Sequence, residues 1–150
     1  MKLKIVVLLI LSAVATNSFG QKSVTEIRTQ LGVSYIITTI NYPIVGSYTF
    51  EGAEPIVTLN ASGTGIYQLH DEPKRPMIWG IESNKEGEPK FKKGYDSTAY
   101  TLWYQFTDST EKDAHTEWKS VELLVNFHKK KIYIQGERVK DFNSVVKKKD

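Results

Sequence analysis

Apolar and polar residues alternate along a series of short segments from Val33 to about residue 135. A period of two is typical of strands that bury one face. The segments are rich in β-branched and aromatic residues and are separated by turn residues, such as those of Asn60–Gly63. No convincing helix lies between them, so the pattern predicts an all-β fold: an antiparallel up-and-down barrel of about eight strands, with a β-sandwich as the alternative.

Seven or eight strands are predicted, and prolines and turn residues set their boundaries. They cover residues 33–40, 46–51, 55–59, 64–69, 77–82, 98–107, 117–127 and 131–135. Residues 83–94 are predicted to be a surface loop, and residues 108–115 a polar turn. Before the first strand, Val24, Ile27 and Leu31 recur at helical spacing, which predicts a short N-terminal helical turn.

The first twenty residues have the layout of a secretory signal peptide. Two lysines precede the apolar run 5–11, small residues follow, and Ser18 and Gly20 form a small-x-small cleavage site. We expect export to a bacterial periplasm or to the exterior, with cleavage between Gly20 and Gln21, which the intact mass of the native protein tests. The apolar run is shorter than the roughly 20 residues that span a bilayer, so no membrane span is expected in the mature chain.

The mature chain, residues 21–150, is long enough for one hydrophobic core and too short for two, so a single domain is predicted. Its basic end, at about residues 145–150, is expected to be frayed. Cleavage removes Lys2 and Lys4 and leaves 18 basic and 17 acidic residues, a balance that excludes a broad basic field for nucleic acid. The chain has no Cys, which excludes disulfides, thiolate metal sites and a thiol nucleophile.

Side chains with catalytic or metal-binding chemistry are scattered along the chain. His70, His115 and His128 lie in or beside predicted turns, and none has a second His two or four residues away, so no metal site is predicted. No Gly-x-Ser-x-Gly elbow occurs, and the acid pair of Glu82 and Glu122 falls on the predicted solvent face. We expect a non-enzymatic protein with no cofactor; a hydrolase whose Ser, His and Asp meet only in the fold is the alternative.

Alternate positions of the predicted strands form one almost wholly apolar face, which we assign to the barrel interior. Four aromatic residues on this face are the predicted ligand-binding residues: Tyr67, Trp79, Tyr100 and Tyr104. A barrel of about eight strands is just wide enough to be filled by its own side chains or to hold one small ligand. Core packing is therefore the alternative interpretation of these four residues.

The opposite face carries three large aromatic residues among its polar ones: Trp103, Trp118 and Tyr133. Exposed aromatic side chains mark surfaces that bind sugar rings or proteins. These residues are the predicted alternative site, for a glycan or an envelope protein. The other interpretation is that segment 24–40, which is rich in Ile and Val, folds back and covers them.

Four short motifs carry a family resemblance over about residues 44–140. They are Gly46-Ser47-Tyr48, like the Gly-x-Trp that opens a lipocalin's first strand; the strand-turn-strand segment 57–65; Met77-Ile78-Trp79; and the closing segment 131–136. With them the chain resembles the small lipocalin-like (calycin-type) barrels exported by Bacteroidetes. That resemblance implies a protein that binds a small apolar ligand inside its barrel.

Overall fold

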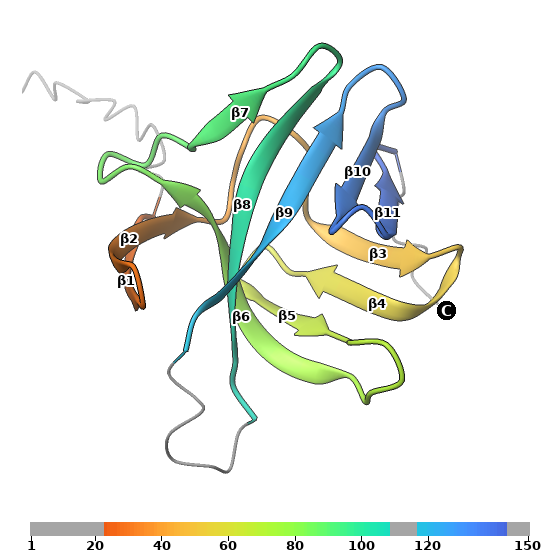
Figure 1. Cartoon of the computed structure of the whole chain (residues 1–150), viewed down its shortest axis with the longest axis horizontal. Helices are drawn as coiled ribbons and strands as arrows, with labels where there is room; N and C mark the ends of the chain where they lie inside the picture. The colour runs from red at the N-terminus through yellow and green to blue at the C-terminus, as the bar shows by residue number, and fades with distance from the viewer. Residues whose placement is uncertain (1–22, 109–116, 144–150) are drawn as a thin grey trace, which may run out of the picture.

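The structure is a computed structural model that describes residues 23–108 and 117–143. Those residues form eleven β-strands and no helix, and eight of the strands form a closed antiparallel barrel (Figure 1). The barrel strands are β3 (Gly46–Phe50), β4 (Ala53–Leu59), β5 (Thr64–Tyr67), β6 (Arg75–Ser83), β8 (Ser97–Phe106), β9 (Lys119–Asn126), β10 (Lys131–Ile134) and β11 (Arg138–Asp141). The predicted signal peptide and the end of the basic tail lie outside the described residues.

Each barrel strand pairs with its neighbours in chain order, which is up-and-down topology. The ring closes where Val139 of β11 pairs with Thr49 of β3, and where β6 pairs with β8 over five residues of each strand. The hairpin predicted at Asn60–Gly63 joins β4 to β5, and the Gly63 amide donates to the Asn60 carbonyl at 3.0 Å. The prediction of an up-and-down barrel of about eight strands is confirmed.

The apolar face predicted from the alternation is the core of the barrel. Five of its residues are no more than 1% exposed and belong to one packed cluster: Val57, Leu59, Met77, Trp79 and Ile81. Tyr48 is also fully buried, and its hydroxyl donates to the Ile44 carbonyl at 2.6 Å, so its polar atom is satisfied. Phe127, which the alternation placed inside, is instead 38% exposed because β9 ends at Asn126.

The helical turn predicted for residues 24–31 is wrong, because these residues begin a β-hairpin. Strand β1 (Thr25–Thr29) pairs with β2 (Gly32–Ile37) along its whole length. Val24 packs against the main core, Ile27 belongs to a second apolar cluster, and Leu31 is 91% exposed in the turn. Val24, Ile27 and Leu31 recur at helical spacing, but they face three different surroundings and do not form one helical face.

The β1–β2 hairpin lies against the outside of the barrel beside β6 (Figure 1). Residues 35–37 of β2 pair with residues 81–83 of β6. Gly80 makes the close approach possible, since a Cβ atom there would lie 2.6 Å from Cβ of Ile36. The hairpin thus packs onto the barrel wall through a position that only glycine accommodates.

Two short strands were missed by the sequence prediction. Strand β7 (Phe91–Lys93) lies in the segment expected to be a surface loop and pairs with the start of β8. Strand β11 follows the segment 131–135 that was expected to end the sheet, and it closes the barrel against β3. Its inward side chains are Arg138 and Lys140, which are 1% and 5% exposed.

Candidate functional site

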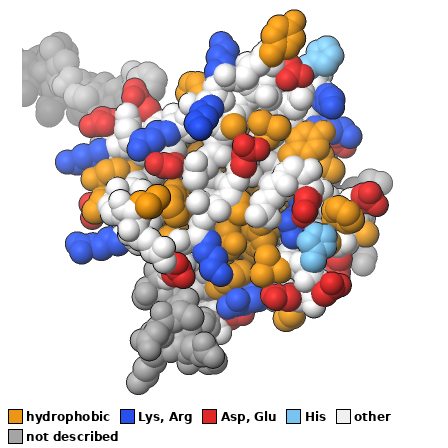
Figure 2. Space-filling model, viewed as in Figure 1, with side chains coloured by type: hydrophobic (Ala, Val, Ile, Leu, Met, Phe, Trp, Pro, Cys, Tyr) orange, Lys and Arg blue, Asp and Glu red, His pale blue; other side chains and the backbone are white. Residues whose placement is uncertain are grey.

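One end of the barrel holds a compact cluster of aromatic side chains. The rings of Tyr67, at the end of β5, and Tyr104, on β8, are stacked with their centroids 4.5 Å apart. Phe106 meets both rings edge-on, at 6.4 and 5.5 Å. Figure 2 shows hydrophobic side chains gathered between β9 and strands β4 and β5, with Lys and Arg side chains beside them. Tyr67 is fully buried, Tyr104 is 5% exposed and Phe106 is part-buried, so the cluster is an aromatic cap on the packed core at this end of the barrel.

A buried arginine lies against this cluster. The Arg138 guanidinium is 5.2 Å from the centre of the Tyr67 ring, and its Nη2 donates to the Gln68 carbonyl at 2.7 Å. Its Nη1 is 3.5 Å from Oε1 of Gln135, which also accepts the Tyr67 hydroxyl at 3.0 Å. Among the described residues, Nε of Arg138 is a buried donor with no acceptor. A buried donor without an acceptor is rare, because it forfeits its hydrogen bonds to water.

A second arginine borders the cluster from β6. The Arg75 guanidinium stacks 3.7 Å from the centre of the Phe106 ring and pairs with Asp108 at 2.9 Å. The hydrogen bonds from Arg75 hold the pKa of the Asp108 carboxyl below its usual value. We refer to Tyr67, Tyr104, Phe106, Arg75 and Arg138 as the barrel-end site. It combines an aromatic surface with two guanidinium groups, one of which lacks a full set of partners.

Burial controls the ionisation of the tyrosines in the barrel. It raises the pKa of Tyr67 to about 12, and it raises the pKa values of Tyr48, Tyr100 and Tyr104 as well. For Tyr104 the nearby Arg138 and Arg75 work in the opposite direction but are weaker than burial. These hydroxyls therefore remain protonated at neutral pH and act as hydrogen-bonding groups.

The raised pKa values predict a loss of stability in alkaline solution. Tyr67 has a folded pKa of about 12 against an ordinary value of 10.0. Its contribution is fully present below pH 10 and is lost as the pH rises from 10 through 12, at up to about 1.4 kcal/mol per pH unit. Urea unfolding between pH 8 and pH 11.5 measures this loss, and Tyr67→Phe should make it shallower. A midpoint independent of pH over this range would contradict the prediction.

The structure stacks two of the four predicted interior site residues, Tyr67 and Tyr104, and places a third, Trp79, directly across from Tyr104 in the β6–β8 pair. The Trp79 indole extends toward the β4–β5 turn, where its Nε1 donates to the carbonyls of Asn60 and Thr64 at 3.2 and 2.8 Å. Tyr100 lies beside β7 in ring contact with Phe91 at 5.8 Å. Trp79 fits the core-packing interpretation, because it is buried and its indole N–H already has hydrogen-bond acceptors at the β4–β5 turn.

The predicted outer aromatic residues do not form one exposed site. Trp103 is only 7% exposed and packs with Ile27 and Ile36, and the half-buried Trp118 lies against the same cluster. Tyr133, also half-buried, lies on β10, separated from β8 and Trp103 by strand β9. The prediction that Trp103 is exposed is therefore wrong. The alternative, that segment 24–40 covers it, is correct. This second cluster is the small core under the β1–β2 hairpin.

Packing in the second cluster holds the β1–β2 hairpin on the barrel wall, so substitutions in this cluster should let the hairpin open. Ile27→Ala is expected to lower the free energy of opening β1–β2 by about 2 kcal/mol, since a buried branched side chain leaves a cavity. Amide hydrogen exchange of β1 and β2 measures it as a roughly thirtyfold acceleration. Leu31→Ala in the exposed turn of the same hairpin is the matched control and should leave exchange unchanged. Equal exchange in both variants would contradict the role of Ile27.

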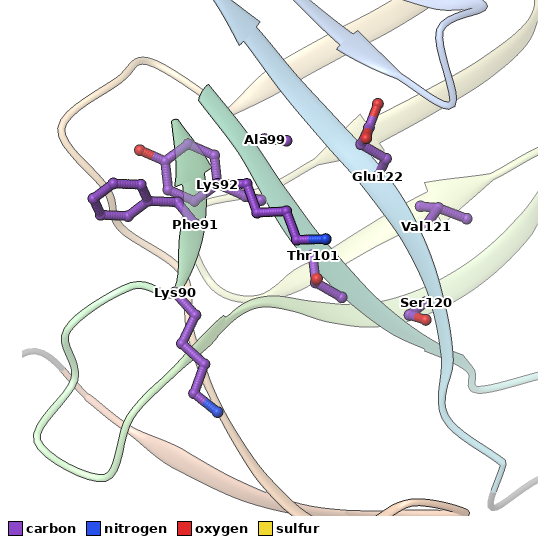
Figure 3. A pocket seen from close by; sticks show the side chains of 9 residues that line it. Lys90, Phe91, Lys92, Ala99, Thr101, Ser120, Val121 and Glu122 are labelled. Carbon is purple, nitrogen blue, oxygen red and sulfur yellow. The ribbon is translucent and has the colours of Figure 1, made fainter. Parts of the chain in front are cut away.

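A groove of about 430 Å³ lies on the outer surface over β7, β8 and β9 (Figure 3). Lys92 extends along β8 toward Thr101, while Lys90 points away and pairs with Glu82 at 3.2 Å. The groove has charges of both signs, from the two lysines and from the exposed Glu122. None of the described side chains that line this groove has a buried polar atom without a hydrogen-bond partner, whereas Arg138 of the barrel-end site does. The barrel-end site is therefore the stronger candidate for ligand binding.

The histidines show no metal-binding arrangement within the part of the chain that the structure describes. His70 pairs with Glu137 at 3.0 Å and contacts the Phe50 ring, and His128 is exposed in the β9–β10 turn. His115 lies outside the described residues. Over residues 23–108 and 117–143, no group of three His, Cys, Asp or Glu side chains is placed to hold a metal ion.

Sequence reasoning missed Arg138, the most unusual residue of the barrel-end site. The signal was the run Arg138-Val139-Lys140, in which an apolar residue separates two cations in the strand pattern. Charged residues are normally assigned to the solvent face, so the sequence pattern places this run outside the predicted strands. In the structure the pattern is inverted: both cations face the barrel and Val139 is only half-buried.

Comparison of the chain with protein-family models, with curated proteins and with solved structures gives no match. Within the described residues, no helix is long and apolar enough to cross a membrane. Function must therefore be argued from the chemistry of the sites, since a barrel architecture hosts many unrelated functions.

Proposed function

We propose that this protein is an exported, non-enzymatic binding protein. Its ligand is a small molecule with an apolar body and one acidic group, held at the barrel-end site. Export is proposed from the order of residues 1–20, which is that of a signal peptide. The observation that carries the ligand assignment is Arg138, a cation 1% exposed whose Nε has no acceptor among the described residues.

The acidic group is proposed because Arg138 is incompletely compensated. Burial of a charge is unfavourable unless the charge is paired and hydrogen-bonded. The nearest carboxylate, that of Glu137, is 3.6 Å from Nη1, is itself half-exposed and also pairs with His70. A guanidinium presents its donors as a rigid planar fork that matches a carboxylate. An acidic ligand oxygen would supply the acceptor that Nε lacks.

The apolar body is proposed because the surface next to Arg138 is aromatic. Tyr67 and Tyr104, both buried, and the part-buried Phe106 form an aromatic group there, and ligand sites are mostly apolar with a few orienting polar groups. The middle of the barrel is filled by its own packed side chains, so the ligand is placed at the barrel end. The resemblance to lipocalin-like barrels supports the same class of ligand.

Octanoate and octan-1-ol test the proposal as a matched pair, since they share an apolar chain and differ in charge. We expect octanoate to bind at least tenfold more tightly, because a hydrogen bond to a charged group contributes about 1.5–3 kcal/mol. Isothermal titration calorimetry measures both affinities, and acetate controls for charge without an apolar body. Equal affinity of the two compounds, or binding of neither, would contradict the proposed ligand class.

A further inference from the structure

A second recess lies between the β1–β2 hairpin and the barrel wall, away from the barrel-end site. It has a volume of about 360 Å³, within the range of about 300–1,000 Å³ found for small-molecule sites. Thr25 of β1 and Ile36 of β2 line it from the hairpin, Ser62 from the β4–β5 turn and Ile78 from β6. Trp118, just before β9, completes it, and we call this recess the hairpin groove.

The lining of the hairpin groove is uncharged. None of the ten described residues that line it is Lys, Arg, His, Asp or Glu. Four of them, among them Thr25, Thr38 and Ser62, carry a side-chain hydroxyl, and the others include Ile36, Ile78 and Trp118. Both the barrel-end site and the groove over β7–β9 contain ionised side chains, so this recess differs from them in chemistry.

We propose that the hairpin groove binds a neutral saccharide, with a sugar ring against the Trp118 indole and sugar hydroxyls bonded to Thr25, Thr38 and Ser62. A sugar ring has an apolar C–H face and a polar rim, which match an indole face bordered by hydroxyls. Each hydroxyl of the lining both donates and accepts, as each sugar hydroxyl does. A charged ligand would find no counter-charge there, and a purely apolar one would desolvate these hydroxyls without replacing their hydrogen bonds.

The walls of the groove are held in place before any ligand arrives. Trp118 packs against the second cluster of Ile27, Ile36 and Trp103, which fixes its indole. The β4–β5 turn is fastened to β6, since the Trp79 amide donates to the Gly63 carbonyl at 2.9 Å. The Ser62 hydroxyl is 2.8 Å from that of Thr64, which orients it and leaves a further hydrogen-bonding position. Groups already in place lower the ordering cost of binding.

Titration of the protein with methyl pyranosides tests this inference by NMR. The probes are the methyl glycosides of glucose, galactose, mannose and N-acetylglucosamine, with glucuronate as the charged counterpart. At least one neutral glycoside should shift the Trp118 indole N–H, assigned with Trp118→Phe, together with the amides of residues 61–63. Glucuronate should produce smaller shifts at the same concentration. Neutral glycosides that leave these resonances unchanged, or octan-1-ol shifting them where sugars do not, would overturn the inference.

A blocking substitution supplies the matched control. Ala61 is exposed and lines the groove, so Ala61→Arg fills it and introduces charge without removing a buried contact. It should weaken glycoside binding at least tenfold. Ala53→Arg makes the same change at an exposed position of β4 outside the groove and should leave binding unchanged. Equal loss in both variants, or in neither, would also overturn the inference, and octanoate binding at the barrel end should be the same in both.

Discussion

Replacement of Trp79 by alanine is expected to destabilise the protein by about 3–5 kcal/mol, the usual range for a large aromatic residue removed from a core. Trp79 is 1% exposed and is among the largest fully buried side chains of the described residues. Its indole N–H also joins the carbonyls of Asn60 and Thr64 at the β4–β5 turn. The substitution therefore creates a cavity and releases a turn at once. Chemical denaturation measures the change in the free energy of unfolding.

Two further variants separate these contributions. Trp79→Phe keeps an aromatic ring but removes the N–H donor, so it should cost about 1–2 kcal/mol, in line with a lost buried hydrogen bond. Tyr95→Ala changes a fully exposed aromatic residue and should stay within about 0.5 kcal/mol. A loss below about 1 kcal/mol for Trp79→Ala would contradict the burial of this side chain.

The barrel could be predicted from the sequence where strands are long and have one buried face. Strands β6, β8 and β9 alternate clearly over eight to ten residues, and the Asn60–Gly63 turn marks a hairpin. Strand β7 has three residues, all exposed, so it has no alternation to detect. In β11 the inward positions are Arg138 and Lys140, so the rule that apolar residues face inward assigns it wrongly.

The candidate site could be predicted only in part, because alternation identifies the face of a residue and not its height along the barrel. Tyr67, Tyr104 and Trp79 all face inward, and Tyr104 is the register partner of Trp79, yet the Tyr104 ring stacks on Tyr67 while the Trp79 indole bonds to the β4–β5 turn. Height depends on the pairing register and strand tilt, which appear only when the ring closes. Trp103 faces outward as predicted, and its cover comes from β1, more than seventy residues earlier in the chain.

Replacement of Arg138 by methionine should separate ligand binding from stability. We expect octanoate affinity to fall at least tenfold, to about that of octan-1-ol, because the proposed hydrogen-bond donor to the acidic group is gone. The free energy of unfolding should change by no more than about 1 kcal/mol. Loss of the bond to the Gln68 carbonyl is opposed by removal of a buried charge, and apolar replacement of buried charges is often neutral or stabilising. Calorimetry and urea unfolding measure the two quantities on the same sample.

Arg75→Met is the matched control for this prediction. Arg75 lies at the same end of the barrel, but its partner Asp108 already satisfies it and both side chains are partly exposed. Its removal should therefore weaken octanoate binding less than the removal of Arg138. If Arg138→Met instead destabilises the fold by more than about 2 kcal/mol and leaves octanoate affinity unchanged, Arg138 is a structural cation that ties β11 to Gln68, the residue after β5. The missing acceptor of its Nε would then be tolerated strain in the barrel and would not indicate a ligand.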